Sequence, residues 1–448
     1  MINCKCFAPI TAPAPKIING EHMTRLAPQP IPTPAALAPP LPRIDPIARL
    51  PILILYPHSR CNCRCLMCDI WRATTTDEIA ADAVAAWLDE WLGLGVRRVV
   101  LSGGEALMHR QLGALCEHLR GAGIGITILS TGLLLRRHAA LVAEHCDDLV
   151  VSLDGPPAIH DKIRNLPNAY AKLAEGIVAV RAAHDRARAG MDAATDRERT
   201  ATHTAHDRAR TGMDAAPDRA RAATHTAHDR ERTGEALAED SPSLKFTSAS
   251  ASPVPIDSIY PSPVITARCT VQRANFRHLR ELVRTAHELG VDRISFLAAD
   301  VDSDAFNRPS GWEAERAAQV ALSAEDVPAL AAELAALEAD HAADFASGFI
   351  AEEPAKLGRR LLQHFAALNG QADFAPMQCN APWVSSVVEA DGTVRPCFFQ
   401  PPLGNIYRDG GLAAVINAPH AIAWRQSLDM ASDPICRRCV CSLNLREG

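Results

Sequence analysis

Residues 50–71 read LPILILYPHSRCNCRCLMCDIW, an apolar run followed after a short polar link by four cysteines within eight positions. The run LPILILY has the length and character of a buried β-strand. The cysteines therefore lie on a loop just beyond the carboxyl end of a strand. Three chemistries use thiols clustered in this way: disulfide bonding, zinc coordination and iron–sulfur cluster binding. The rest of the sequence has to discriminate among them.

The bulk composition is that of an ordinary globular protein, with 448 residues, 48% hydrophobic and 22% charged. This length allows two or three domains, each with its own core. A formal charge of −6 does not indicate a nucleic-acid partner, and no apolar stretch approaches the roughly 20 residues of a membrane span. The start, MINCKCFAPITAPAPK, lacks the apolar region of a secretory signal. We therefore expect a cytoplasmic protein, whose reduced cysteines bind metal rather than form disulfides.

Strand and helix patterns alternate from residue 50 to about 300. The later strand patterns are VRRVVLSGG, IGITILSTG, DDLVVSLDG, SPVITARCTVQ and VDRISFLAA, and helical patterns such as NFRHLRELVRTAHELG separate them. Thr75-x-x-Glu78 predicts a capping box at the start of the first helix. Six strands alternating with helices predict parallel β/α units. The expected fold is α/β, a partial (β/α)6 TIM-like barrel whose ligands gather at the carboxyl ends of the strands.

Two segments fall outside this pattern. Residues 1–48 are proline-rich and predict a disordered, extended arm. Between the fourth and fifth strands, HDRARAGMDAATDRERTATHTA (184–205) recurs as HDRARTGMDAAPDRARAATHTA (206–227). This unit is too charged to bury a face against its neighbour, as a solenoid repeat must. Residues 182–257 are therefore expected to be a low-complexity insertion within a core domain of residues 49–310.

The C-terminal part predicts a helical linker (311–372) and a small cysteine-bearing domain (373–448). Two β-like arms flank Asp391-Gly392, which is a hairpin signal. Four cysteines form a ligand set, in which a C-x2-C turn lets both sulfurs of the last pair face one metal: Cys379, Cys397, Cys436 and Cys439. A C-x-C pair in an extended segment points its side chains to opposite faces, so Cys441 is not expected to join them.

Glycine, acid and hydroxyl residues occupy the other predicted strand ends. Gly103-Gly104-Glu105 closes the second strand, Ser130-Thr131-Gly132 the third, and Ser152-Leu153-Asp154-Gly155 the fourth. Glycines allow close backbone approach, Glu105 offers a carboxylate to a cationic group, and Ser152 with Asp154 suits ribose hydroxyls. One such motif is usually only a turn. Their occurrence in order at successive strand ends indicates a single binding site.

The segments CNCRCLMCDIW, SGGEAL, STG, SLDGPPAIHDKIRN and ITARCTVQRANF together resemble the radical S-adenosylmethionine (SAM) superfamily. The resemblance covers about residues 50–181 and 258–300. It implies that Cys61, Cys65 and Cys68 hold a [4Fe–4S] cluster whose free iron chelates the methionine moiety of SAM. It also implies cofactor contacts for Gly103, Gly104, Glu105, Thr131, Ser152, Asp154 and Arg164 and, more remotely, for Asn275. Ala106 stands where the family usually has proline.

The C-terminal cysteines resemble the twitch domain, a short relative of the SPASM domain. This resemblance implies an auxiliary [4Fe–4S] cluster on Cys379, Cys397, Cys436 and Cys439. Zinc is the alternative at both sites, since three or four clustered thiols also suit it. Cys63 is expected to point away from the first ligand set. Sulfatase-maturing relatives carry an acid at the position of Phe398, so Phe398 argues against sulfatase maturation. The absence of a C-terminal Gly-Gly argues against GTP cyclisation.

The function implied by the resemblance is reductive cleavage of SAM to a 5′-deoxyadenosyl radical, which abstracts hydrogen from a substrate. An external one-electron donor such as a flavodoxin or ferredoxin would supply the electron. Relatives with such C-terminal domains act on peptides, tetrapyrroles or small natural products. The alternative is a non-catalytic iron–sulfur or zinc protein that serves as a scaffold or electron carrier. The intact cysteine triad, Glu105 and Asp154 speak against that alternative.

Overall fold

The structure, a computed structural model, describes residues 42–190, 262–308 and 311–446. Residues 42–184, 262–308 and 311–446 belong to one compact unit, and residues 185–190 are the described part of a second. The arm up to residue 41 and nearly all of the predicted repeat insertion lie outside the described residues. Within these ranges, no helix combines the length and apolar character that crossing a membrane requires.

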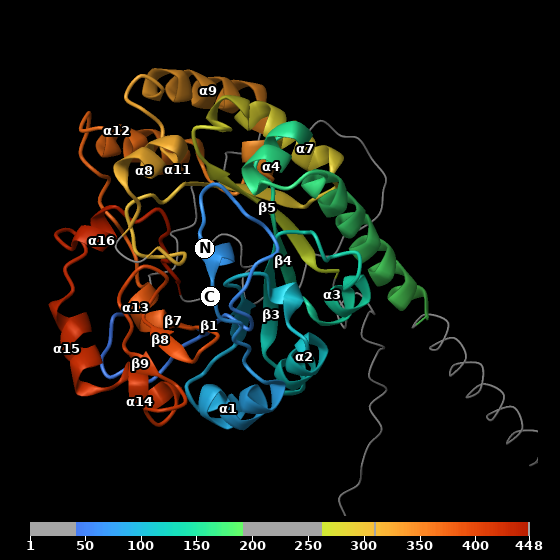
Figure 1. The fold of residues 1–448 in the computed structure, drawn as a ribbon, viewed down its shortest axis with the longest axis vertical. Helices are drawn as coiled ribbons and strands as arrows, with labels where there is room; N and C mark the ends of the chain where they lie inside the picture. Colours follow the sequence, from blue (N-terminus) through green and yellow to red (C-terminus); the bar gives the residue numbers. More distant parts are fainter. Residues whose placement is uncertain (1–41, 191–261, 309–310, 447–448) are drawn as a thin grey trace, which may run out of the picture. The chain divides into compact units, whose positions relative to one another are not determined.

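Nine strands form one sheet: β1 Ile52–Leu55, β2 Arg98–Leu101, β3 Gly125–Ser130, β4 Asp148–Ser152, β5 Val264–Val271, β6 Arg293–Ala298, β7 Ser385–Val388, β8 Thr393–Arg395 and β9 Gly404–Asn405. The order across the sheet is β6-β5-β4-β3-β2-β1-β7-β8-β9 (Figure 1). Strands β1 to β6 are parallel neighbours in chain order. Among the described strands β6 pairs only with β5, so the sheet does not close on itself. The predicted partial (β/α)6 barrel is confirmed.

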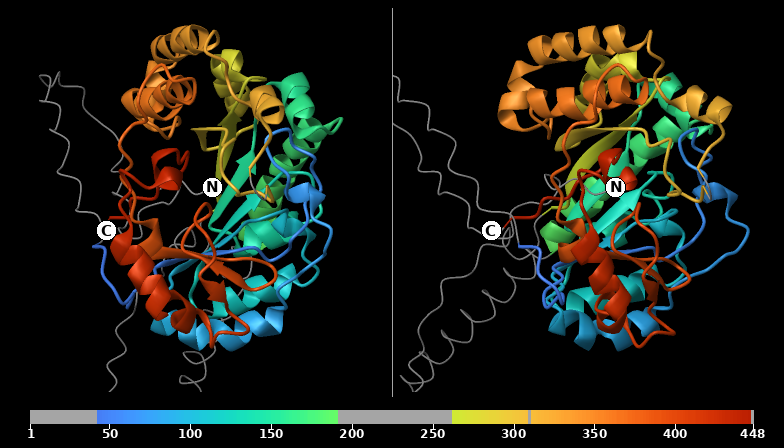
Figure 2. Two further views of the ribbon diagram at one scale, coloured as in Figure 1. Left: turned by 60° about the vertical axis from the view of Figure 1, so that its left-hand side comes forward. Right: turned by 90° about the vertical axis from the view of Figure 1, so that its left-hand side faces the viewer.

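Helices connect these strands and cover the outer side of the curved sheet (Figures 1 and 2). They are α1 Ala81–Gly93, α2 Leu112–Gly121, α3 Ala139–His145, α4 Pro157–Arg164, a helix over 169–190 at the end of the described range, and α7 Leu279–Glu288. Strand residues alternate between two cores. Leu53 and Leu55 pack into the large core under the helices, whereas Ile52 and Ile54 face a second core containing Trp383.

The first helix begins later than the sequence predicts. Helix α1 starts at Ala81, and the segment before it pairs with the loop after β1, through an antiparallel bridge between His58 and Glu78. The Glu78 carboxylate accepts a hydrogen bond from Arg110 Nε at 2.5 Å, and Thr75 Oγ1 donates to Asp77 Oδ2 at 2.6 Å. The capping-box prediction is therefore wrong, because Thr75 and Glu78 lie before the helix and their side chains bond to Asp77 and Arg110 instead.

The predicted hairpin is present and extends the barrel sheet. Strands β7 and β8 are antiparallel around Asp391-Gly392, and Thr393 N donates to Asp391 Oδ1 at 2.9 Å. Strand β7 also pairs in parallel with β1, and Tyr56 N donates to Val388 O at 2.8 Å (Figure 2, red beside blue). The C-terminal cysteine domain is thus joined directly to the strand that leads into the first cysteine loop.

The segment predicted as a helical linker packs onto the barrel. Its helices are α8 Ala314–Val320, α9 Val327–Asp340, α10 Ala342–Ser347, α11 Pro354–Leu357, a π-helix Gly358–Gln363 and α12 His364–Leu368. Leu330, Leu337 and Phe365 join the large core, and Phe296 N of the edge strand β6 donates to Glu352 at 3.1 Å. This cover satisfies part of an edge that would otherwise expose unpaired backbone groups. The last helices are α13 Ala381–Val384, α14 Leu412–Ile416, α15 Pro419–Ser427 and α16 Pro434–Arg437.

Residues 42–48, assigned from sequence to the disordered arm, contact the C-terminal domain. Arg43 donates to Cys379 O at 2.8 Å, Ile47 N donates to Asn417 at 2.7 Å, and Asp45 accepts from Arg425 Nε at 2.5 Å. The Arg425 side chain is fully buried and Asp45 nearly so. The described end of the arm is therefore ordered by long-range partners that composition does not reveal.

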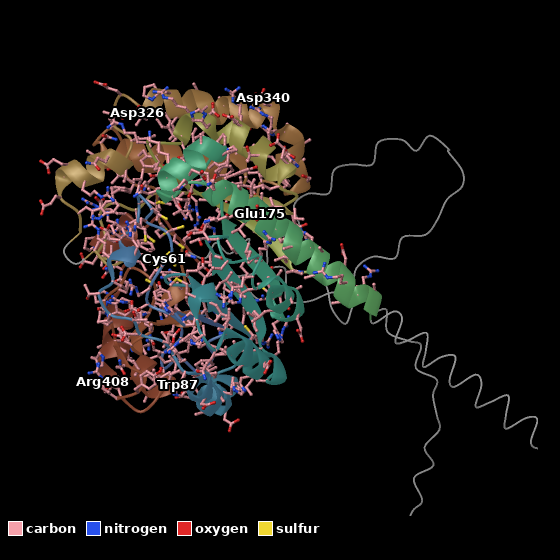
Figure 3. The ribbon with its side chains drawn as sticks, turned by 45° about the vertical axis from the view of Figure 1, so that its right-hand side comes forward. Cys61, Trp87, Glu175, Asp326, Asp340 and Arg408 are labelled. Carbon is pink, nitrogen blue, oxygen red and sulfur yellow. The ribbon has the colours of Figure 1, made fainter. Side chains whose placement is uncertain are left out.

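We expect Asp45→Ala to lower the free energy of unfolding by about 3–5 kcal/mol, because it leaves the buried Arg425 charge uncompensated. Denaturant unfolding of the purified protein measures this change. The control is Glu175→Ala, which breaks an ion pair with Arg136 whose side chains are 57% and 75% exposed. Figure 3 shows Glu175 on the long helix outside the sheet. A surface pair of this kind contributes little, so equal effects of the two variants would contradict the prediction.

Candidate metal centres

The four cysteines of the first cluster lie on the loop that follows β1, at the carboxyl ends of the parallel strands. Figure 3 labels Cys61 on this loop. Cys63 and Cys65 are buried, and Cys61 and Cys68 are half-buried. All twelve cysteines that the structure describes are free thiols. Across the same residues, no group of three or more His, Cys, Asp or Glu side chains is arranged to hold a metal ion.

Each of the three predicted ligand sulfurs accepts an N–H donor. Cys61 Sγ accepts from the backbone N–H of Cys63 at 3.5 Å, and Cys68 Sγ accepts from that of Ile70 at 3.5 Å. Cys65 Sγ accepts from the Arg164 guanidinium at 3.4 Å. Such donors stabilise a thiolate and are one of the means by which proteins tune iron–sulfur clusters. The donor set of this loop therefore fits thiolate ligands.

The expectation that Cys63 points away from the other cysteines is wrong. Its thiol donates a hydrogen bond to Cys65, and it lies with Cys65 in the same buried cluster of side chains. This hydrogen bond and the Arg164 charge hold the pKa of Cys65 at about 7, although burial raises it. Burial raises the pKa of Cys68 to about 12. Cys65 is thus the most acidic of these thiols, and Cys63 acts on it directly.

The end of helix α4 accepts two backbone hydrogen bonds from the cysteine loop. Leu66 N donates to Ile163 O at 3.0 Å, and Arg64 N donates to Arg164 O at 3.3 Å. The helix ends there because Asn165 adopts a left-handed conformation. The segment that carries Arg164 therefore sets both the backbone position of the loop and the donor to Cys65.

The loop after β6 holds the other side of the cysteine loop. Asp69 accepts a hydrogen bond from Trp312 Nε1 at 2.6 Å, and its backbone N–H donates to Phe306 O at 3.2 Å. Arg316 donates to Leu66 O at 2.7 Å. Sequence reasoning did not single out these residues. Asp69 directly follows the last cysteine, but Trp312 and Phe306 are more than 230 positions away from it, so no local pattern identifies these contacts.

Gly103 and Gly104 lie against the segment that joins β1 to the cysteine loop. A Cβ atom on Gly103, which has φ +91°, would lie 2.5 Å from the Tyr56 ring, and one on Gly104 would lie 2.1 Å from Arg60 O. Glu105 N donates to that same Arg60 carbonyl at 2.9 Å. The two glycines therefore allow the loop after β2 to lie directly against the chain that enters the cysteine loop.

The Glu105 carboxylate is fully buried and joins the ends of β2 and β3. One oxygen, Oε2, lies 2.7 Å from Thr131 N, 2.5 Å from Thr131 Oγ1 and 3.2 Å from Ser130 Oγ. The other, Oε1, accepts from Leu107 N at 3.1 Å. Burial raises the pKa of Glu105 despite these donors. Thr131 Oγ1 also lies 3.1 Å from Asn62 Oδ1 in the cysteine loop, so Glu105 and Thr131 adjoin the predicted cluster site.

Asp154, predicted to contact ribose, is buried beneath the loop. It forms an ion pair with Arg164 and accepts from Thr270 N at 2.9 Å. Asn275 Nδ2 donates to the Asp154 carbonyl at 2.9 Å, so Asn275 orders the end of β4. Ser152, at the last position of that strand, is only half-buried. Asn275, Asp154, Arg164 and Cys65 are thus connected by successive polar contacts. Ser152 is more exposed to solvent than Asp154.

The C-terminal cysteines share one pocket. Cys379, Cys397, Cys436, Cys439 and Cys441 all line it, and the rest of its wall is mostly apolar and includes Ile54 and Phe398. The pocket therefore offers thiols in a largely apolar setting, next to β1.

Three of the four predicted auxiliary ligands accept a hydrogen bond from an N–H group. Ala381 N donates to Cys379 at 3.4 Å, Gln400 Nε2 donates to Cys436 at 3.3 Å, and Cys441 N donates to Cys439 at 3.4 Å. Backbone hydrogen bonds from residues 399 and 400 lower the pKa of Cys397, although burial raises it to about 12. This donor pattern matches that of the first loop and fits an iron–sulfur cluster.

The expectation that Cys439 and Cys441 face opposite sides is wrong. The chain bends at Val440, which is buried, and both cysteines line the pocket. The alternation argument holds only for an extended strand, and this segment is not one. Gln400 and Asp433 were also missed. Asp433 caps α16 by accepting from Cys436 N at 2.7 Å, and Gln400 donates to it at 3.1 Å.

Comparisons with known proteins agree with these two centres. Residues 55–191 match the family model of the Radical SAM superfamily, and residues 379–440 match that of SPASM, an iron–sulfur cluster-binding domain. The chain is similar to an AdoMet-dependent heme synthase of Methanosarcina barkeri, with 30% identity over 28% of this chain and 37% of the relative. It is also similar to GTP 3′,8-cyclase 2 of Pseudomonas aeruginosa, with 33% identity over 25% and 36%. The matched region thus spans little more than a third of these relatives.

Among solved structures, the native anSMEcpe structure with bound AdoMet resembles the chain over 87% of each protein, at 15% identity and a TM-score of 0.50. This likeness concerns the fold. The barrel region and the C-terminal region each carry a group of thiols, and each matches a family model of its own. Residues 55–191 are therefore a radical SAM-type region, and residues 379–440 a SPASM-type region. The first domain implies a [4Fe–4S] cluster and SAM, and the second implies auxiliary iron–sulfur binding.

Proposed function

We propose that the protein cleaves SAM reductively at a cluster held by Cys61, Cys65 and Cys68. A cluster held there would supply the low-potential electron that reductive cleavage of SAM and hydrogen abstraction from a substrate require. The observation that carries this proposal is that three sulfurs on one loop each accept an N–H donor. Zinc sites also use thiolates, but the adjoining Gly103-Gly104-Glu105 turn has no role in a closed zinc site.

The chain's own residues supply binding and orientation. Glu105 holds Thr131 and the end of β3 through Oε2, and its Oε1 accepts from Leu107 N in the described contacts. A carboxylate oxygen has more than one lone pair, so Oε1 retains capacity to accept from the amino group of the methionine moiety. Ser152 is the accessible hydroxyl at the neighbouring strand end. The buried strand ends exclude water, which protects a reactive product.

The auxiliary centre is proposed to hold a second [4Fe–4S] cluster on Cys379, Cys397, Cys436 and Cys439. It would bind the substrate or accept its electron. Two relatives are named for haem-related products, but the similarity covers only 28% of this chain and supports the radical chemistry only. We therefore keep peptides, tetrapyrroles and small natural products as substrate classes. A cytoplasmic flavodoxin or ferredoxin is the proposed electron donor.

Anaerobic reconstitution with iron and sulfide, followed by SAM and dithionite, tests the function. We expect about eight irons per chain, from two four-iron clusters, and release of 5′-deoxyadenosine. Cys116→Ala is the control, because Cys116 lies on the buried face of α2 and its replacement should not affect the iron content. Tightly bound zinc without SAM cleavage would instead support the non-catalytic scaffold or electron carrier.

For the auxiliary centre, we expect Cys439→Ser to lose about half of the iron, as one of two four-iron clusters is lost. Uncoupled SAM cleavage at the first cluster should continue. Cys441→Ser is the matched control, because Cys441 lines the same pocket but lies just outside residues 379–440 that match SPASM, and this variant should leave the iron content unchanged. Iron analysis and the iron–sulfur absorbance of both variants show which of the two cysteines is a cluster ligand. If Cys441→Ser lost the cluster and Cys439→Ser kept it, the ligand assignment would be wrong.

A further inference from the structure

We propose that the buried Arg164–Asp154 pair sets the reduction potential of the first cluster through the Arg164 hydrogen bond to Cys65. This inference rests on the proposed cluster at Cys61, Cys65 and Cys68. It assigns Arg164 a role toward the cysteine sulfur in addition to the cofactor contact that the sequence resemblance implies. Arg164 is then a positioning and tuning residue, and Asp154 acts through it.

The geometry that carries the proposal is a short chain of charged groups. Arg164 Nη1 lies 3.4 Å from Cys65 Sγ, and Nη2 of the same guanidinium pairs with Asp154 Oδ2. One side of the planar group thus faces the sulfur and the other faces the carboxylate. The cation is nearer to Cys65, and the carboxylate lies behind it.

Burial makes these charges effective. The Arg164 side chain is 7% exposed and that of Asp154 is 0% exposed. Charges removed from solvent interact far more strongly than exposed ones, because little water screens them. By contrast, Arg64 on the same loop is exposed, and its guanidinium lies over the Trp71 ring.

The pair is also fixed in place. Asp154 accepts from Thr270 N at 2.9 Å on β5, and its backbone carbonyl accepts from Asn275 Nδ2. Its backbone N–H donates to His160 Nδ1 at 3.2 Å. The Arg164 backbone in turn holds the cysteine loop through Arg64 N. The orientation of the guanidinium toward the sulfur is therefore built into the ends of β4, β5 and α4.

The consequence for redox chemistry follows from charge. Reduction adds one electron to the cluster, and a nearby cation stabilises the added negative charge, which raises the reduction potential. A carboxylate behind the cation offsets part of that effect. Removing the positive charge should therefore lower the potential, and removing the negative charge should raise it.

The test is an EPR-monitored redox titration of the reconstituted full-length protein. The signal that changes on addition of SAM identifies the first cluster and separates it from the auxiliary one. We expect Arg164→Gln to shift its midpoint to more negative potential and Asp154→Asn to shift it to more positive potential. Arg164→Lys, which retains a charge and an N–H donor, should lie between wild type and Arg164→Gln. The matched control Arg64→Gln removes an exposed charge and should leave the midpoint unchanged.

Shifts of opposite sign distinguish tuning from a merely structural role, which would perturb both variants alike. If one single variant fails to fold, the double variant Arg164→Gln/Asp154→Asn buries no unpaired charge and should have a midpoint below that of Asp154→Asn. A SAM-responsive signal with the same midpoint in all variants would overturn this inference alone. A wild-type protein without any SAM-responsive signal would overturn the proposed function, and this inference with it.

Discussion

Replacement of Cys65 by alanine is expected to reduce SAM cleavage to the background rate while leaving about half of the iron bound. Cys65 is the most deeply placed of the three proposed ligands, and it receives hydrogen bonds from both Cys63 and Arg164. A cube that loses one of three thiolates on a single loop has no spare ligand in the right position unless Cys63 substitutes. The auxiliary cysteines line a separate pocket, so their iron should be retained.

Cys63→Ala is the matched control, because Cys63 is equally buried and belongs to the same loop. It removes the hydrogen bond to Cys65 but no proposed ligand. We therefore expect full iron content and measurable 5′-deoxyadenosine release. Both variants are compared by iron analysis and by chromatography of the products. Cleavage at the wild-type rate in Cys65→Ala, or its loss in Cys63→Ala alone, would show that Cys63 is the ligand.

The strands and the order of motifs could be predicted because they depend on local patterns. Buried strands such as β1 appear as apolar runs, and the Asp391-Gly392 turn specifies its hairpin. The sequence did not reveal that β7 would pair with β1, since pairing between residues more than 300 positions apart leaves no periodic signal. For the same reason, the ordering of Asp45 by Arg425 was missed.

The sequence placed the site residues near one another and did not predict their individual contacts. The three proposed ligand cysteines lie together on one loop, and the Gly103-Gly104-Glu105 turn lies beside them. The partners of individual groups depended on the tertiary structure. Asp154 pairs with Arg164 beneath the cysteines. Cys441 turns into the auxiliary pocket because the chain bends at Val440. Local propensity determines neither a buried ion pair nor an irregular bend.

The close approach of the loop after β2 to the cysteine loop gives the second large expected effect. A Cβ atom on Gly104 would lie 2.1 Å from Arg60 O, a backbone atom that cannot rotate away. The segments around Gly104 and Arg60 must therefore move apart, which also strains the hydrogen bond from Glu105 N to Arg60 O. Overpacking of this kind typically costs about 1–3 kcal/mol. The displaced backbone is the one that leads directly into Cys61.

Gly104→Ala is therefore expected to destabilise the protein by about this amount and to lose the first cluster, while the auxiliary cluster is retained. Gly121→Ala is the matched control, because nothing lies within 4 Å of a Cβ at that helical position. That variant should be stabilised by roughly 0.4–1 kcal/mol through the unfolded chain. Denaturant unfolding of the apoprotein and iron content after reconstitution report the two effects separately. If Gly104→Ala kept both clusters and its stability, the contact between the two loops would not be needed to hold the cysteines, and the glycine would have to act on the cofactor alone.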